Sequence, residues 1–210
     1  MKTKRTDVKE KEIILKDGIK QIVLIREKQN ILTYSNPKLG KVFVGKDFLK
    51  LNSDEQMAII YHERGHFKKS INIIQRFFNL FLFLSEFAVF LLFVSGIAKL
   101  LFLLKIVPAT FLFNNLYFQF TNTFIIILII GLIGTMLSSW LIELYCDFNA
   151  LKNTNKEVLI SAMKRGYKYQ AIRMNKKLSS RLFWFAPILF SKIILHPPHK
   201  LRFKLISELD

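Results

Sequence analysis

The chain has 210 residues, which is enough for one domain of ordinary size but not for two with full cores. It is 51% hydrophobic with 21 Phe, and its formal net charge of +17 alone is typical of a nucleic-acid-binding protein. However, residues 77–142 hold only Lys99, Lys105 and Glu86 as charged residues and separate two basic ends. A nearly uncharged middle between basic regions indicates membrane segments rather than a basic groove for DNA or RNA.

Residues 12–50 contain four short runs rich in β-branched side chains, with turn residues such as Asp17-Gly18 and Asn36-Pro37 between them. This pattern predicts a small N-terminal antiparallel sheet. The predicted strands are 12–16, 22–25, 31–34 and 41–44.

Residues 53–70 are predicted to form a helix. Ser53 followed by Gln56 three residues later is a capping-box pattern, and the acidic residues Asp54 and Glu55 suit the positive end of a helix. A chemically informative motif, residues 62–66, is therefore expected in the middle of this helix.

That motif reads His-Glu-Arg-Gly-His. His62 and His66 are four residues apart, so on a helix they project from one face and can bind one zinc ion. Glu63 lies beside the first histidine, where a carboxylate can act as general base and then as general acid. Alone, the five-residue pattern fits ordinary helix residues as well as it fits a zinc site.

Residues 77–105 and 123–142 predict a transmembrane hairpin. Residues 77–98 are long enough to cross the ~30 Å hydrocarbon layer as a helix, and 123–142 carry no charge. Glu86 interrupts the first span; we expect it to be protonated, to pack against the second span or to face an interior cavity, with a proton relay as the functional alternative. Two spans return the chain to its starting side, and the positive-inside rule makes that side cytoplasmic.

Residues 143–210 follow the hairpin and begin with two acidic residues on helical spacing, Glu143 and Asp147. Catalytic zinc commonly has three protein ligands, so Glu143 can complete a site with two histidines. Asp147 can hydrogen-bond the other ring nitrogen of a ligand histidine and fix its tautomer. A helix start at the membrane surface is the alternative for this pair.

Further along the chain, residues 149–181 are predicted to form a polar helix. Residues 182–195 are predicted to form an apolar core or interface segment rather than a third membrane crossing.

These motifs, with a late element His196-Pro197-Pro198-His199-Lys200-Leu201-Arg202, resemble the HtpX-type membrane metallopeptidases, relatives of the CAAX prenyl endopeptidases. The resemblance covers roughly residues 49–205. It implies an α+β membrane protein: one mainly helical, gluzincin-like metallopeptidase domain over 1–210, with the hairpin inserted between the two metal-binding helices.

The resemblance also implies roles for individual residues. Glu143 becomes the third ligand of one Zn²⁺ ion per chain, and Asp147 the partner of a ligand histidine. His196 and Arg202 become candidates for holding the substrate backbone or the oxyanion, since both can donate to a developing negative charge. Their alternative is a capped helix start with Arg202 in a structural salt bridge, and His199 is expected at the surface.

The function expected from these features is a zinc endopeptidase of a prokaryotic plasma membrane, with both termini and the active site cytoplasmic. Its partners would be the lipid bilayer and membrane-associated or misfolded polypeptides, not nucleic acid; the oligomeric state is left open. An extended substrate could pair with an edge strand of the sheet.

Two other functions remain open. Cys146-Asp147 is also similar to the β-lactam-sensor signalling metalloproteases. A non-catalytic zinc-binding membrane adaptor is the third possibility, although such a site has no need for Glu63. The additional N-terminal membrane hairpin usual in HtpX-type enzymes is not seen in this sequence.

Overall fold

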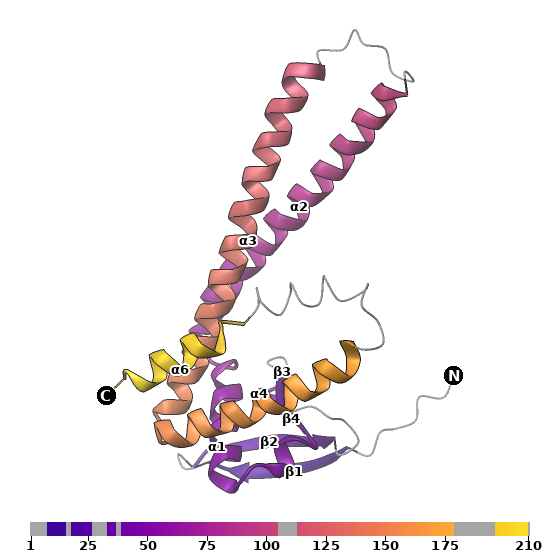
Figure 1. The fold of residues 1–210 in the computed structure, drawn as a ribbon. Helices are drawn as coiled ribbons and strands as arrows, with labels where there is room; N and C mark the ends of the chain where they lie inside the picture. Colours follow the sequence, from indigo (N-terminus) through magenta and orange to yellow (C-terminus); the bar gives the residue numbers. More distant parts are fainter. Residues whose placement is uncertain are drawn as a thin grey trace.

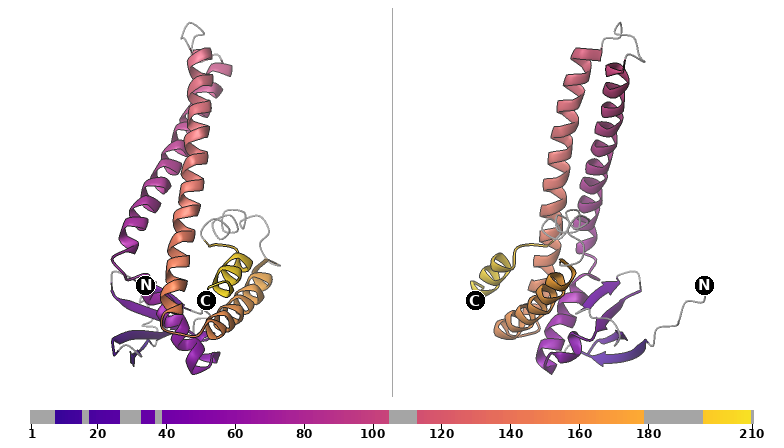
Figure 2. Two further views of the ribbon diagram at one scale, coloured as in Figure 1. Left: turned by 90° about the vertical axis from the view of Figure 1, so that its left-hand side faces the viewer. Right: turned by 45° about the vertical axis from the view of Figure 1, so that its right-hand side comes forward.

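The structure, a computed structural model, describes residues 8–15, 18–26, 33–36, 39–104, 113–178 and 196–209. It is a mixed α/β chain, mostly helical, in which two long helices rise from a base formed by a small sheet and the shorter helices (Figure 1). Two further views show the same pair of long helices extending away from this base (Figure 2). The expected apolar segment 182–195 lies outside the described residues.

One sheet contains four strands in the order β1–β2–β4–β3. The outer pairs β1/β2 and β3/β4 are antiparallel, but the central pair β2/β4 is parallel, so the prediction of a wholly antiparallel sheet is wrong. The physical reason is burial, since Val42 and Val44 of β4 are fully buried and need neighbours on both sides. The strands are β1 (Lys9–Ile14), β2 (Lys20–Arg26), β3 (Thr33–Asn36) and β4 (Lys41–Gly45).

Helix α1 (Ser53–Gly65) follows a single 3-10 turn, η1 (Phe48–Lys50). Its capping box is built by Asn52 and Glu55, one residue before the predicted Ser53–Gln56 pair: the Asn52 side chain accepts from the Glu55 N–H at 2.8 Å, and the Glu55 carboxylate accepts from the Asn52 N–H at 3.1 Å. The helix also ends at Gly65 rather than near 70. The His-Glu-Arg-Gly-His motif therefore lies at the end of the helix, not in its middle.

Helices α2 (Ile71–Leu103) and α3 (Phe113–Leu151) are the two long helices. Both are long and apolar enough to span a membrane, over Ile71–Leu101 and Phe120–Leu151. Glycines allow the helices to pack closely: a Cβ on Gly131 would lie 2.4 Å from Ser85 Oγ, and one on Gly134 would lie 2.3 Å from the Phe81 ring. The same helix α3 then continues without a break into the segment that holds the predicted acidic pair.

Glu86 lies on the outside of this helix pair. Ser85 faces α3 and is 6% exposed, and a rotation of about 100° per residue carries Glu86 away from that contact. The Glu86 side chain is exposed. The expectation that it packs against the second span or lies in an interior cavity is therefore wrong.

The hydrophobic core lies where the sheet meets α1, the end of α3, and two further helices, α4 (Lys156–Leu178) and α6 (His199–Ser207). α4 begins later than the helix predicted from residue 149, because α3 runs on to Leu151 and a short turn follows. The most deeply buried side chains of this core include Val42, Val44, Ala58, Ile60, Tyr61, Ala150, Leu159 and Ala162. Packing of α1 against the end of α3 brings two distant parts of the sequence together.

Candidate metal centre

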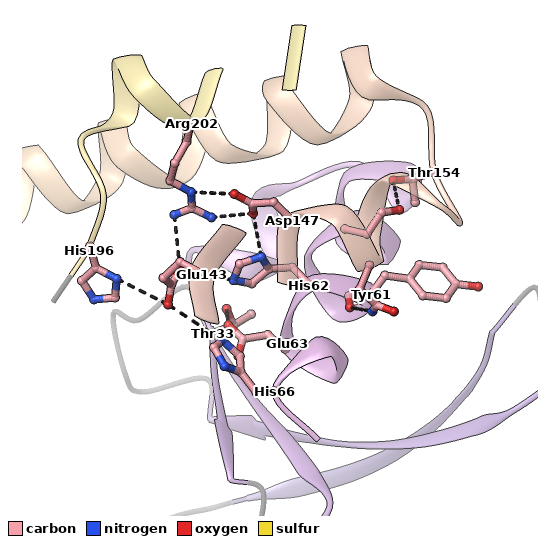
Figure 3. A network of polar contacts seen from close by, with 12 residues as sticks. Thr33, Tyr61, His62, Glu63, His66, Glu143, Asp147, Thr154, His196 and Arg202 are labelled. Atoms are coloured by element: carbon pink, nitrogen blue, oxygen red, sulfur yellow. Dashed lines mark hydrogen bonds and ion pairs between the residues drawn. The ribbon is translucent and has the colours of Figure 1, made fainter. Parts of the chain in front are cut away.

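Three side chains with metal-binding atoms meet between α1 and α3 (Figure 3). His62 Nε2 lies 3.6 Å from Glu143 Oε2, and His66 Nε2 lies 3.9 Å from Glu143 Oε1. The ligand atoms of all three residues lie within 4.8 Å of one another. In tetrahedral zinc sites with bonds of about 2.0–2.2 Å, neighbouring ligand atoms are about 3.4 Å apart, so small side-chain movements bring these three onto one ion. The structure thus brings together the three predicted ligands in a group that could hold a metal ion.

Close contact between α1 and α3 sets the distance between the histidines and Glu143. A Cβ on Gly65 would lie 2.8 Å from the Cα of Cys146, so glycine is required for this approach. The Asn149 side chain donates a 2.6 Å hydrogen bond to the backbone carbonyl of Tyr61, and both residues are buried. The sequence does not reveal this second contact, because an Asn near a helix end is ordinarily read as a solvent-facing residue.

Asp147 lies behind His62 and is 1% exposed. Its Oδ1 is 2.8 Å from His62 Nδ1, and since an ionised carboxylate only accepts, the Nδ1–H of His62 is the donor. A neutral His62 with its proton on Nδ1 presents the lone pair of Nε2 to Glu143 and the metal position. The geometry is the one expected for a residue that orients a ligand histidine.

Arg202, from α6, holds Asp147 from the other side. Its Nε donates to Asp147 Oδ2 at 2.7 Å and its Nη2 to Oδ1 at 2.6 Å. Its Nη1 donates to the Tyr167 hydroxyl at 2.7 Å and lies 3.4 Å from Glu143 Oε2. Arg202 is only 6% exposed, so the alternative of a structural salt bridge describes its contacts better than contact with a substrate.

The charges of the centre suit a divalent cation. Glu63, Glu143 and Asp147 supply three negative charges and Arg202 one positive charge, which leaves a net charge of −2 when the histidines are neutral. Burial opposes the charge of Arg202, but the hydrogen bonds and negative charge of Asp147 outweigh burial and raise its pKa, so it stays cationic.

The two histidines experience different surroundings. Burial lowers the pKa of His62, but the hydrogen bond with Asp147 and the negative charges of Asp147 and Glu143 outweigh burial and raise it. For His66, burial and the neighbouring His62 lower the pKa. The same negative charges that favour a proton on His62 favour a metal cation in its place.

Glu63 lies next to His66 in the centre (Figure 3) and is 8% exposed. Its Oε1 accepts a 2.5 Å hydrogen bond from the hydroxyl of Thr33, the first residue of the edge strand β3. Among the described residues no other side chain hydrogen-bonds Glu63, so its second carboxylate oxygen remains available. Thr33 was not among the predicted site residues, because nothing in a short strand-like run indicates which threonine faces a helix 30 positions later.

His196 lies just before α6 and His199 is its first residue, but their side chains have different surroundings. His196 Nδ1 lies 3.5 Å from Glu143 Oε1, and its side chain is 52% exposed, at the rim of the centre. The His199 ring stacks on the Tyr167 ring, with 3.2 Å between ring centroids. His199 is exposed, as predicted, but partial burial of its ring against Tyr167 and the positive charge of Arg202 lower its pKa. Burial also raises the pKa of Tyr167 to about 12, so its hydroxyl stays neutral beside Arg202.

Four segments that are distant in the sequence therefore build the centre: β3, the end of α1, the end of α3, and the start of α6 with the residues just before it. Comparisons of the chain with protein-family models, with curated proteins and with solved structures find no match. The function must be inferred from the chemistry of the centre.

We predict that Asp147→Asn weakens zinc binding by about 10- to 100-fold, because an amide cannot hold both His62 and Arg202 as the carboxylate does. Zinc affinity is measured by competition with a chromogenic chelator. Asp54→Asn, at an exposed position of α1, is the matched control and should bind zinc as the wild type does. Equal zinc affinity of both variants would contradict the orienting role of Asp147.

Proposed function

We propose that the chain is a membrane-embedded zinc endopeptidase that hydrolyses peptide bonds of polypeptides at the membrane surface. The observation that carries this proposal is the convergence of His62, His66 and Glu143 with Glu63 beside them. Structural zinc sites are closed by four protein ligands, whereas this group offers three among the described residues and so leaves a position for water or substrate. The set is also the one implied by the resemblance to HtpX-type metallopeptidases.

Each residue has a chemical task in this proposal. The zinc ion, when bound, supplies a Lewis acid that polarises the scissile carbonyl. The free carboxylate oxygen of Glu63 accepts a proton from the attacking water and delivers it to the leaving amine. Thr33, by occupying the other oxygen, fixes the orientation of the Glu63 carboxylate. His196 lies at the exposed rim, where its ring can donate to negative charge developing on the carbonyl oxygen.

Arg202 has a different task, because it is buried and its donors already point at Asp147 and Tyr167. We assign it as a positioning residue that keeps Asp147 ionised and aligned. His62 is then held indirectly by α6, across the hydrogen bond between His62 and Asp147.

The position of strand β3 supports a proposal for the substrate class. It is at the edge of the sheet, pairs with β4 on one side, and carries Thr33 next to Glu63. An extended polypeptide can pair with the other side of such a strand and so place its backbone beside the centre. Misfolded or membrane-associated polypeptides offer extended segments of this kind, and they are the substrates we propose.

Membrane insertion is supported by the side chains on the outside of α2 and α3. Large apolar residues there are exposed, for example Phe83 at 61%, Phe93 at 66% and Ile126 at 57%. A surface of this extent is unusual on a soluble protein, whereas in a bilayer it faces lipid. The basic residues on either side of the apolar middle support, by the positive-inside rule, the proposal that the base and the centre face the cytoplasm of a prokaryote.

We expect Glu63→Gln to retain zinc and to lose peptide-bond cleavage by about 10²- to 10⁴-fold, because the amide cannot accept the proton of the attacking water. The protein is reconstituted with zinc, and cleavage of unfolded casein and of a membrane-anchored polypeptide is followed on gels. Glu157→Gln, at an exposed position of α4, serves as the control. A wild type that binds zinc but cleaves neither substrate would favour the adaptor, and equal cleavage by Glu63→Gln would refute the role of Glu63.

Thr33→Val removes the hydroxyl but suits a strand, so it tests the orientation of Glu63 separately from the sheet. We expect kcat to fall by about tenfold, since one hydrogen bond to a charged group contributes roughly 1.5 kcal/mol, with zinc content unchanged. Thr33→Ser should restore activity, and Ser35→Ala on the same strand should not alter it. Loss of zinc from Thr33→Val would instead indicate that Thr33 supports the ligand residues.

His196→Ala is expected to lower kcat by about 10²-fold with little change in zinc affinity, because its half-exposed ring lies beside Glu143 but is not one of the three proposed ligands. His199→Ala, only three positions later, removes a ring that stacks on Tyr167 and should leave kcat near that of the wild type. Steady-state kinetics on a fluorogenic peptide gives both values. Similar kcat values for the two variants would exclude His196 from a role in the reaction.

A further inference from the structure

Helix α2 has two packing faces, and α3 occupies only one of them. Phe81, Ser85 and Ala88 form the occupied face, where they meet Gly131, Gly134 and their neighbours on α3. The second face lies about 100° around the helix, the rotation from Ser85 to Glu86. We call it the polar seam; its members are Asn72, Gln75, Asn79, Leu82, Glu86, Val89, Phe93 and Leu100.

The polar seam has the spacing of a coiled-coil contact. Asn72, Asn79, Glu86, Phe93 and Leu100 are each seven residues apart, and the other members lie three residues after one of them. Every member is exposed, and the four apolar members range from Leu82 at 38% to Phe93 at 66%. The face also carries four polar residues, Asn72, Gln75, Asn79 and Glu86, and polar residues of a membrane helix ordinarily face another protein segment rather than lipid.

Exposure of the Glu86 side chain to lipid would be energetically unfavourable in a bilayer. It lies nine residues after Phe77, about 13.5 Å along the helix and therefore near the middle of the ~30 Å hydrocarbon layer. No described residue hydrogen-bonds or ion-pairs with its side chain. An ionisable group facing lipid at this depth is unfavourable, and such groups ordinarily face protein.

We propose that the polar seam binds the polar seam of a second copy of this chain, so that the two α2 helices pack side by side in the membrane, each with its own α3 on its other packing face. Membrane topology gives both copies the same orientation, and a two-fold axis then places each seam residue opposite its own counterpart. Amides and carboxyl groups suit this arrangement, because Asn and a protonated Glu both donate and accept hydrogen bonds. The pairs would be Asn72, Asn79 and Glu86, each with its equivalent in the second copy.

The angle between the two faces of α2 leaves room for both contacts. The occupied face and the polar seam are separated by about 100°, so α2 can contact its own α3 and a second α2 simultaneously. This inference rests on the proposed membrane insertion, but not on the proposed peptidase activity.

Cysteine cross-linking in the membrane tests the proposal. Phe93→Cys lies on the polar seam, and Phe87→Cys lies about 120° away on an equally lipid-facing part of α2, 46% exposed in the wild type. The native Cys146 is buried and is kept in both variants. Oxidation in proteoliposomes at a low protein-to-lipid ratio should give at least tenfold more covalent dimer for Phe93→Cys. Equal yields at both positions, or no dimer at Phe93→Cys, would overturn the proposal.

Substitutions of Glu86 in the Phe93→Cys background identify what holds the pair together. Glu86→Leu should lower the dimer yield severalfold, whereas Glu86→Gln, whose amide also pairs with itself, should keep it. A yield unaffected by Glu86→Leu would show that Glu86 does not contribute to the contact and would refute the assigned pairing. Alkaline extraction of the vesicles is run in parallel: release of the protein would refute insertion and the dimer with it, while zinc-dependent cleavage is measured separately.

Discussion

The buried contact of Asp147 with His62 and Arg202 is the interaction on which the centre depends. It joins α1, α3 and α6 through one carboxylate that is 1% exposed. Three hydrogen-bond donors from His62 and Arg202 make this burial tolerable, because an isolated ionised carboxylate in the same place would be strongly destabilising. The contact also fixes which nitrogen of His62 faces Glu143. Folding of the base and preparation of the proposed zinc site are therefore the same event.

The sequence allowed much of this centre to be predicted. Spacing alone places His62 and His66 on one helix face, and the uncharged stretches after them have the length of two crossing helices. From these two features Glu143 is expected to return to the side where the histidines lie, and the structure brings the three residues together. Such predictions succeed because helical periodicity and membrane-spanning length are local properties of the chain.

Contacts between distant segments could not be predicted in the same way. The parallel pairing of β2 with β4 depends on which strand is most buried, and the hydrogen bond from Thr33 to Glu63 depends in turn on that strand order. The hydrogen bond from the Asn149 side chain to the Tyr61 carbonyl depends on how α1 and α3 cross, which the sequence does not reveal. Two of the alternatives for Glu86, packing against the second span and an interior cavity, place it inside the hairpin, but the rotation of α2 is decided by small residues on α3 that a single-helix pattern does not reveal.

Helix α3 is one continuous rod from Phe113 to Leu151, so the part that is apolar enough to span a membrane and the part that carries Glu143 cannot move independently. A helix longer than the local hydrocarbon thickness accommodates the difference by tilting. A tilt of α3 would displace Glu143. The two histidines lie at the end of α1, which packs against the sheet, and would not move with α3. In the proposed membrane-embedded protein, the thickness of the surrounding bilayer would thus be a mechanical variable of the centre, able to change the distances among the three proposed ligands without any contact between lipid and metal.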